Sequence, residues 1–190
     1  MSLEIFGFAD GENLVLRYED MIKNGAKPKR DAIHIPGLLA WHPQITTLFV
    51  GDVSRLSYYQ TVVGDDIFLD SAKDSISNTK YLYFSTKNQG KHPDARGFLY
   101  PKIYKKSSKN TKSKSVDINI TVDALRCVIN DTGNVVFILS GDGDYLPLVE
   151  EINRHGKQVW VGAFSRGLNK NLRYAADEFF DLDSIFFENH

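Results

Sequence analysis

The feature that most constrains the fold is a run of apolar residues at 135–139 that leads directly into a turn holding two carboxylates. A continuous apolar run of this length is typical of a strand buried on both faces, as in a parallel sheet. After the turn, apolar residues recur at a helical period over 146–152. This order of strand, turn and helix places Asp142 and Asp144 at the carboxyl end of a strand, where open α/β sheets bind their ligands.

The same alternation of strands and helices continues along the rest of the chain. Strands are predicted at 5–9, 46–53, 81–85, 134–139, 158–164 and 179–182, and 55–63 either extends the second of these or forms another. Helices are predicted at 14–24, 66–76, 117–129, 145–155 and 169–177. Residues 27–43 are irregular, although their apolar side chains indicate that part of the segment packs against the rest of the domain. The predicted fold is therefore α/β, a three-layer sandwich with a mostly parallel central sheet, in one domain over 1–190.

Composition bounds the class of protein. The chain has 190 residues, 42% hydrophobic and 25% charged, which is ordinary for a globular domain with its own core. No apolar run approaches the length of a membrane span, and the first residues do not resemble a secretory signal. The single cysteine, Cys127, excludes an intrachain disulfide, so that a reducing, cytoplasmic setting and no membrane partner are expected. The five histidines are never at zinc-ligand spacing, which argues against a zinc site.

The charge distribution is more informative than the net charge of −1. A lysine-rich loop is predicted at about 87–115, with a ragged hairpin around 98–104. Between residues 96 and 115 there are seven basic residues and no acid: Arg96, Lys102, Lys105, Lys106, Lys109, Lys112 and Lys114. A basic arm beside an acidic pocket is expected of an enzyme that acts on a polyanion, whereas charge alone favours a solvated loop.

Carboxylates stand at the ends of several predicted elements. If the sheet is parallel, Asp10 and Asp142 emerge at the same edge and repel one another unless a cation lies between them. Oxygen ligands select hard cations, so Mg²⁺ or Mn²⁺ is expected. Asp117 and Asp123 are separated by about 9 Å along one helix and by roughly 120° around it, so they are not twin ligands of one ion. One of them binds metal while the other orients water or a second ion.

Simpler interpretations exist for each residue taken alone. Asp117 and Asp144 stand where a helix cap is wanted, and Asn13 is a suitable cap before the first helix. Of the two acids in the strong turn, Asp142 is the expected ligand, and Asp144 is the expected cap with at most a supporting role. Leu146 stands where a calcium loop needs its third ligand and where a haloacid-dehalogenase-type phosphatase needs an acid, which excludes both classes.

Read together, three segments resemble the NYN domain family, the LabA-like branch of the PIN-like nuclease superfamily. The segments are 8–14, 115–125 and 139–148, and the tail agrees at 156–159 and 171–179. The resemblance implies a PIN-like sandwich and a Mg²⁺- or Mn²⁺-dependent nuclease site that usually acts on RNA. It implies metal ligands at Asp10, Asp117 and Asp142, an orienting neighbour at Asn13, and supporting acids at Asp123 and Asp144.

The resemblance also implies a surface that grips a phosphate backbone. The candidate cations are Arg55, Lys102, Lys105, Lys106, Lys112, Lys114 and Arg173. Four tyrosines, Tyr58, Tyr59, Tyr100 and Tyr104, are candidates to stack on bases, although sheet packing is the expected role of at least half of them.

Two functions stay open at this point. The first is an endonuclease that cleaves phosphodiester bonds, in single-stranded RNA before all else, with water activated by the metal. The second is a non-catalytic RNA- or protein-binding regulatory module on the same fold. The sequence does not separate RNA from single-stranded DNA, and a homodimer is among the open oligomeric states.

Overall fold

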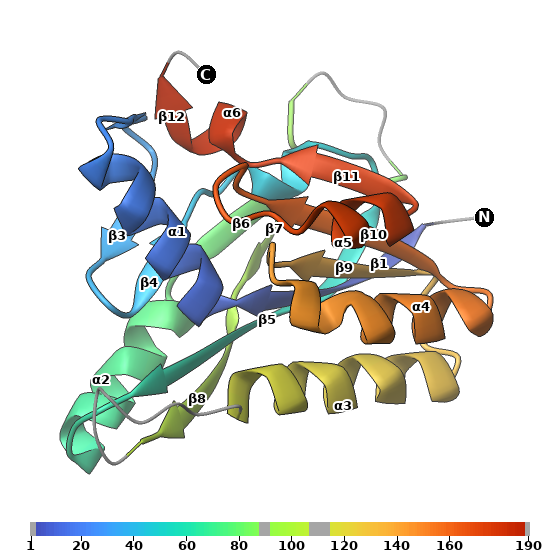
Figure 1. Cartoon of the computed structure of the whole chain (residues 1–190), viewed down its shortest axis with the longest axis horizontal. Helices are drawn as coiled ribbons and strands as arrows, with labels where there is room; N and C mark the ends of the chain where they lie inside the picture. The colour runs from blue at the N-terminus through green and yellow to red at the C-terminus, as the bar shows by residue number, and fades with distance from the viewer. Residues whose placement is uncertain (1–2, 88–91, 107–114, 189–190) are drawn as a thin grey trace.

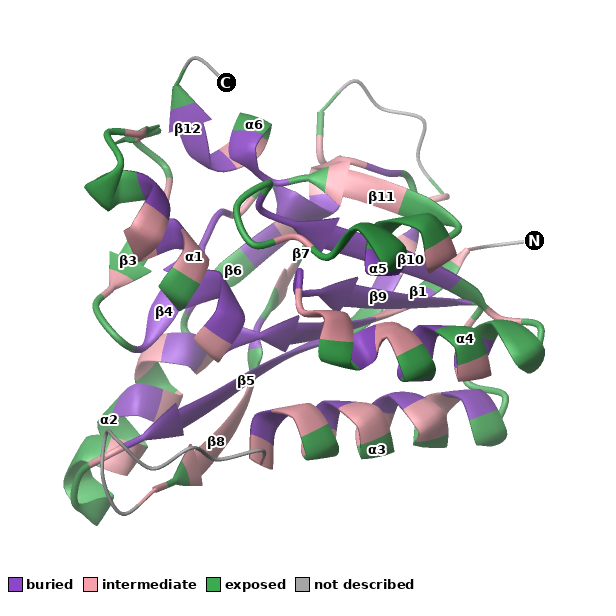
Figure 2. Cartoon of the chain, in the orientation of Figure 1, coloured by how far each residue is buried: buried purple, intermediate pink, exposed green. Residues whose placement is uncertain are grey.

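The computed structural model describes residues 3–87, 92–106 and 115–188, and its centre is a parallel sheet (Figure 1). The six strands of this sheet lie in the order β11-β10-β9-β1-β5-β8, and every neighbouring pair is parallel. Their bounds are β1 (Glu4–Asp10), β5 (Asp52–Val62), β8 (Tyr100–Lys105), β9 (Val135–Leu139), β10 (Gln158–Ala163) and β11 (Glu178–Asp181). Every residue of β9 is buried, as the apolar run predicts (Figure 2).

Helices cover both faces of the sheet. They are α1 (Gly11–Lys23), α2 (Asp66–Ser77), α3 (Ser115–Ile129), α4 (Leu146–Arg154), α5 (Lys170–Ala175) and α6 (Asp183–Phe186), with short 3-10 turns η1 (Ile45–Thr47) and η2 (Gly143–Tyr145). One hydrophobic cluster joins the sheet to α3, α4 and α5, and a second joins it to α1, α2 and α6. The predicted three-layer α/β sandwich is therefore confirmed. Among the described residues, no helix combines the length and apolar character needed to cross a membrane.

Three small antiparallel pairs lie outside the main sheet. They join β2 (Lys27–Pro28) to β12 (Phe187–Glu188), β3 (Ile33–Ile35) to β4 (Leu39–Trp41), and β6 (Lys80–Tyr83) to β7 (Ala95–Phe98). Part of the irregular segment 27–43 packs against the core as predicted: Leu38, Leu39 and Trp41 are buried.

Two predicted elements are wrong. The strand predicted at 46–53 is wrong over 46–51, since Ile45 and Thr46 are buried in the turn of η1 and the long strand β5 begins only at Asp52. The hairpin around 98–104 does not form either. Leu99 is buried between the two segments, so that β7 pairs with β6 while β8 becomes the edge strand of the main sheet. Pro101 is tolerated in β8 because an edge strand leaves some N–H positions unpaired.

The described part of the lysine-rich segment is therefore largely strand, where a loop is predicted. Residues 95–98 and 100–105 within it are strands, and Lys102 and Lys105 lie on the edge strand β8. Lys109, Lys112 and Lys114 lie outside the described residues. The described part of the segment is thus attached to the sheet next to β5, on the far side of β5 from β1.

Candidate active site

Asp10 is the last residue of β1 and stands at the junction with α1. Its exposed fraction is 3%, and its side chain caps α1 by accepting a hydrogen bond from the Asn13 N–H at 3.0 Å. Burial raises the pKa of Asp10 to about 7, and the nearby Asp117 adds to the rise. Hydrogen bonds from Asn13, Ser140 and Tyr145 lower the pKa but do not cancel the effect of burial. This carboxyl therefore exchanges its proton near neutral pH.

The hydroxyl of Tyr145 lies between two carboxyl groups. It is 3.2 Å from Asp10 Oδ2 and 3.2 Å from Asp117 Oδ1. Burial and the two acids raise the pKa of Tyr145 far above its ordinary range, so the hydroxyl keeps its proton. One hydroxyl has one proton to donate, so it satisfies only one of the two oxygens. The other contact needs a proton on a carboxyl, or a cation, to offset the repulsion.

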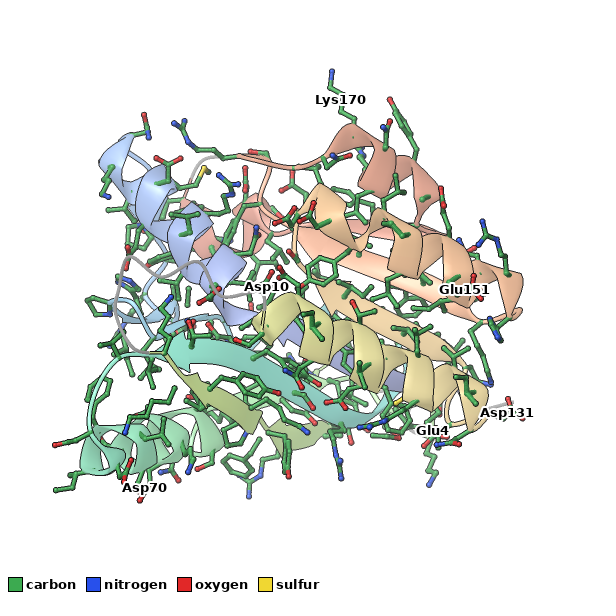
Figure 3. All side chains as sticks on the ribbon, turned by 60° about the horizontal axis from the view of Figure 1, so that its bottom comes forward. Glu4, Asp10, Asp70, Asp131, Glu151 and Lys170 are labelled. Atoms are coloured by element: carbon green, nitrogen blue, oxygen red, sulfur yellow. The ribbon has the colours of Figure 1, made fainter. Side chains whose placement is uncertain are left out.

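Asp117 is the third residue of α3 and belongs to the same electrostatic site. The helix begins at Ser115, so Asp117 is not the cap residue. Burial raises the pKa of Asp117, and the charges of Asp142, Asp144 and Glu12 raise it further, although the hydrogen bond from Tyr145 opposes them. Figure 3 shows the labelled Asp10 where the first turns of α1 and α3 face one another. Acids from three elements thus share one region at the carboxyl edge of the sheet.

The turn after β9 is bonded directly to Asp10 and α1. Ser140, which is buried, donates from Oγ to Asp10 Oδ2 at 3.1 Å and accepts from the Asp142 N–H at 3.2 Å. Asn13 Oδ1 accepts from the Gly141 N–H at 3.3 Å, so Asn13 orients this turn rather than capping α1. Neighbouring parallel strands bring the two segments together, because Ala9 of β1 pairs with Leu139 of β9.

The cap in this turn is Asp142. Its Oδ1 accepts from the Asp144 N–H at 3.0 Å, and it precedes η2. Asp144 is a residue of η2 itself, and its side chain is exposed to solvent. The prediction that Asp144 is the cap is therefore wrong. Asp142 thus lies at the N-terminus of η2, and its charge is one of those that raise the pKa of Asp117.

Asp123 lies apart from this group. Its carboxylate accepts from the Tyr59 hydroxyl at 2.8 Å and pairs with Lys102 at 3.3 Å and with Arg126 at 3.4 Å. This arrangement agrees with the helix geometry, which separates Asp123 from Asp117 by more than one turn. Asp123 is a neutralised acid at the rim of the site, and its predicted supporting role stays a prediction.

Comparison with known proteins decides the family. A family model for the NYN domain matches residues 8–183, nearly the whole chain. The chain belongs to the NYN domain family. This confirms the resemblance carried by the three sequence segments and gives the domain a nuclease-like, PIN-like fold.

Solved structures agree on the fold. The NYN domain is similar to the crystal structure of a protein of unknown function from Vibrio parahaemolyticus, with a TM-score of 0.59 and 19% sequence identity. The similarity covers 98% of this chain and 97% of that chain. No curated protein matches the sequence. The likeness to the Vibrio protein therefore supports the architecture of the whole domain.

The candidate cations of the NYN domain divide into two groups. Lys106 pairs with Glu12 at 3.3 Å, and Lys102 pairs with Asp123, so each pairs with an acid outside the inner pair of Asp10 and Asp117. The other described cations make contacts elsewhere: Lys105 pairs with Asp66, Arg55 lies over Tyr100 and Arg173 lies over Phe179. Lys112 and Lys114 are outside the described residues.

The four candidate tyrosines divide into two that are fully buried and two that are not. Tyr58 and Tyr59 are fully buried, so they pack in the core and cannot stack on bases. Tyr104 is partly buried against the α3 side, and Tyr100 is exposed on the edge strand. The expectation that at least half of them serve sheet packing is confirmed.

Carboxylates are suitable ligands for a hard divalent cation, but the structure brings only some of the candidate acids close together. Among residues 3–87, 92–106 and 115–188, no three side chains of His, Cys, Asp or Glu stand close enough together to hold an ion. Asp10 and Asp117 are brought together through the Tyr145 hydroxyl, which lies 3.2 Å from an oxygen of each. Two carboxyls that compete for one proton form a site that a cation would stabilise, so the residues present fit such an ion.

Two residues that bear on the site are missing from the sequence prediction. Ser140 and Tyr145 carry no charge, and each reads as an ordinary part of a strand end or a helix start. Their positions flank Asp142 in the same turn, which is the signal that could have found them. A small hydroxyl and a tyrosine beside a carboxylate at a strand end are natural donors to buried acids.

Proposed function

We propose that the protein is a divalent-metal-dependent endonuclease that cuts single-stranded RNA. The observation that carries the proposal is the pair of carboxyls, Asp10 and Asp117, that share the Tyr145 hydroxyl at the carboxyl edge of a parallel sheet. Membership in the NYN domain family supports it, because the fold of that family is nuclease-like. The proposed setting is the cytoplasm.

Asp10, Asp117 and Asp142 would hold Mg²⁺ or Mn²⁺. Such an ion supplies two things to hydrolysis, a water of lowered pKa and stabilisation of the charge that develops on the phosphodiester. The residues around the acids keep them in position. Ser140 and Tyr145 donate hydrogen bonds to the buried Asp10, and Asn13 accepts from the backbone of the Asp142 turn. The acids are thereby held in place before a substrate arrives.

Lysines on and after β8 would bind the RNA backbone. Lys106 and Lys102 already reach the rim of the site, where each pairs with an acid that is partly exposed. Ion pairs of this kind contribute little to stability, so a phosphate can replace the acid as partner at small cost. Further contacts are proposed for the remaining candidates: Arg55, Lys105, Lys112, Lys114 and Arg173.

The proposal is tested with Asp142→Asn. Asparagine is as good a helix cap as aspartate and can accept the same hydrogen bond from the Asp144 N–H, so the variant should fold normally. We expect it to abolish cleavage of a labelled single-stranded RNA in Mn²⁺, as followed on a denaturing gel. Asp70→Asn, which neutralises an exposed carboxylate on α2, is the matched control and should cut at the normal rate. Full activity of the Asp142 variant would contradict the proposal.

A non-catalytic RNA-binding module is the second candidate. It is favoured by the absence of a three-ligand group among the described residues and by the lysines that already neutralise Glu12 and Asp123. Such a module would bind the RNA equally well in EDTA and in Mn²⁺ and would leave it uncut in both. Cleavage that appears with Mn²⁺ and disappears with EDTA decides for the enzyme.

A further inference from the structure

A cavity of about 420 Å³ lies outside the candidate active site. Its walls come from residues 30–33, residues 42–44 and β6, next to the hydrophobic cluster that joins the sheet to α1, α2 and α6. Asp117 belongs to α3, on the other face of the sheet. A cavity of this volume is in the range of sites that bind small molecules.

Hydrogen bonds hold the walls of the cavity in place. The Leu82 N–H donates to the Pro43 carbonyl at 2.8 Å, and the Thr46 hydroxyl donates to the Leu82 carbonyl at 2.6 Å. The wall that begins after Lys29 is attached to α6, because the Lys29 N–H donates to the Phe186 carbonyl at 2.7 Å. The cavity is therefore formed by the fold itself before any ligand arrives.

His42 lines the cavity as a neutral ring with a defined proton. It is 2% exposed, and its Nδ1 accepts a hydrogen bond from the Gln44 N–H at 3.2 Å. Burial lowers the pKa of His42; the charge of Asp31 opposes this effect and that of Lys29 adds to it. A neutral imidazole carries one proton, and since Nδ1 is an acceptor, the proton is on Nε2.

The Nε2–H of His42 has no acceptor among the described residues. It is not sealed from solvent either, since Arg17 Nε is the one side-chain nitrogen or oxygen of the described residues that is both sealed and unpaired. His42 is otherwise almost fully buried and lines the cavity, so this donor opens onto the cavity. A directed donor without a partner in a cavity is suited to an acceptor group of a ligand.

Two cations line the same cavity without an ion pair to any described residue. Arg30 and Lys80 are both exposed, and the acid that lines the cavity with them is Asp31. Because His42 is neutral, two cations against one acid leave the lining with a net charge of +1. The apolar part of the lining is formed by Ala32, Ile33, Pro43 and Leu82. The cavity thus offers positive charge, one fixed donor and an apolar surface.

We propose that this cavity binds a small organic anion. Its carboxylate or phosphate group accepts the hydrogen bond from His42 Nε2, near the charges of Arg30 and Lys80. Its apolar body lies against Ile33 and Leu82. A charged acceptor forms a stronger hydrogen bond than a neutral one, which favours an anion over an amide or an alcohol. The inference goes beyond the proposed function, because no residue of the cavity has a part in the metal binding or RNA binding proposed above.

The test follows the ring nitrogens of His42 by NMR in the natural protein. The chain has five histidines, and Gln variants of the other four assign the His42 signals by elimination. Benzoate and phenyl phosphate share a phenyl ring and differ in head group, and benzamide is the neutral counterpart of benzoate. We expect the anions to move the Nε2 signal saturably, with a Kd of about 1 mM for compounds this small, and the tighter of the two identifies the head group. Benzamide should leave the signal in place.

Two substitutions in the walls test the role of charge. Arg30→Gln together with Lys80→Gln should weaken the binding of the anion about tenfold, the combined scale of two partly exposed ion pairs. Both side chains are exposed, so the variant should keep its fold. The control is Lys73→Gln together with Arg154→Gln, which removes two charges from exposed ion pairs on α2 and α4 and should change Kd by less than about twofold.

Three results would overturn the anion site. The first is a His42 signal that no compound moves at about ten times the expected Kd. The second is equal movement with benzamide and benzoate, which would make the cavity an apolar site without a preference for charge. The third is an equal loss of affinity in the wall variant and its control. The acids of the proposed nuclease site are unchanged in every variant, so each of these results leaves the proposed function standing.

Discussion

Because Asp10 is buried, its charge should weaken the fold as the pH rises. The pKa of Asp10 lies at about 7 in the folded protein, above its ordinary value of 3.8, chiefly because of burial. When the folded-state pKa is the higher one, stability is complete below the unfolded-state pKa and is lost as the pH rises toward the folded-state pKa. The relevant window for Asp10 therefore runs from about pH 4 to about pH 7.

The size of the effect follows from the two pKa values. Each pKa unit corresponds to about 1.4 kcal/mol, so ionisation of Asp10 lowers the free energy of unfolding by about 2 kcal/mol at pH 5 and about 4 kcal/mol at pH 8. Asp10→Asn has no such cost and can still accept the cap hydrogen bond from Asn13. The difference in stability between the variant and the natural protein should thus grow by about 2 to 3 kcal/mol from pH 5 to pH 8.

Urea unfolding measures this difference. Trp41 and Trp160 are both buried, so their fluorescence reports the transition. The experiment is run without divalent metal at both pH values, with Asp70→Asn as the control for loss of an exposed carboxylate, whose difference from the natural protein should not change with pH. An Asp10→Asn difference that is equally independent of pH would refute the reasoning, since it would mean that Asp10 is not held in a protonated state by burial.

Two further changes test the surroundings of Asp10. Tyr145→Phe removes the hydroxyl that both acids share; it should lower the free energy of unfolding by about 1 kcal/mol. The acid limb of the cleavage pH profile should move upward, because the pKa of Asp117 loses a hydrogen bond that lowers it, and an unmoved limb would contradict this role. Gly11→Ala should destabilise the fold by about 2 kcal/mol in the same urea assay, since the new methyl group would lie 2.6 Å from the Tyr59 carbonyl oxygen and closer still to the buried Tyr58 ring. Normal stability would mean that α1 can shift at its first residue.

The central part of the site could be predicted because it depends on topology. A buried run at 135–139 and a short apolar segment ending at Asp10 predict neighbouring parallel strands, and parallel strands place their following residues at one edge. The structure pairs Ala9 with Leu139, so Asp10 and the turn of Asp142 meet there. No side-chain detail is needed for that conclusion.

The remainder depends on packing that periodicity does not encode. Leu99 is a single buried residue between β7 and β8, and these two strands pair in different sheets. The roles of Ser140 and Tyr145 depend on which buried oxygen each hydroxyl reaches.

The contacts also show where uncompensated negative charge collects. The acids at the rim have cationic partners, since Glu12 pairs with Lys106 and Asp123 pairs with Lys102. Among the described residues, Asp10 and Asp117 have only hydroxyl and backbone donors, and burial makes their shared charge more costly than the charge at the rim. Under the proposed function, a divalent cation that enters this region would be drawn to the inner pair, and a phosphate backbone would compete for the lysines outside it. The same separation of charge keeps the lysines from neutralising the acids that would bind the ion.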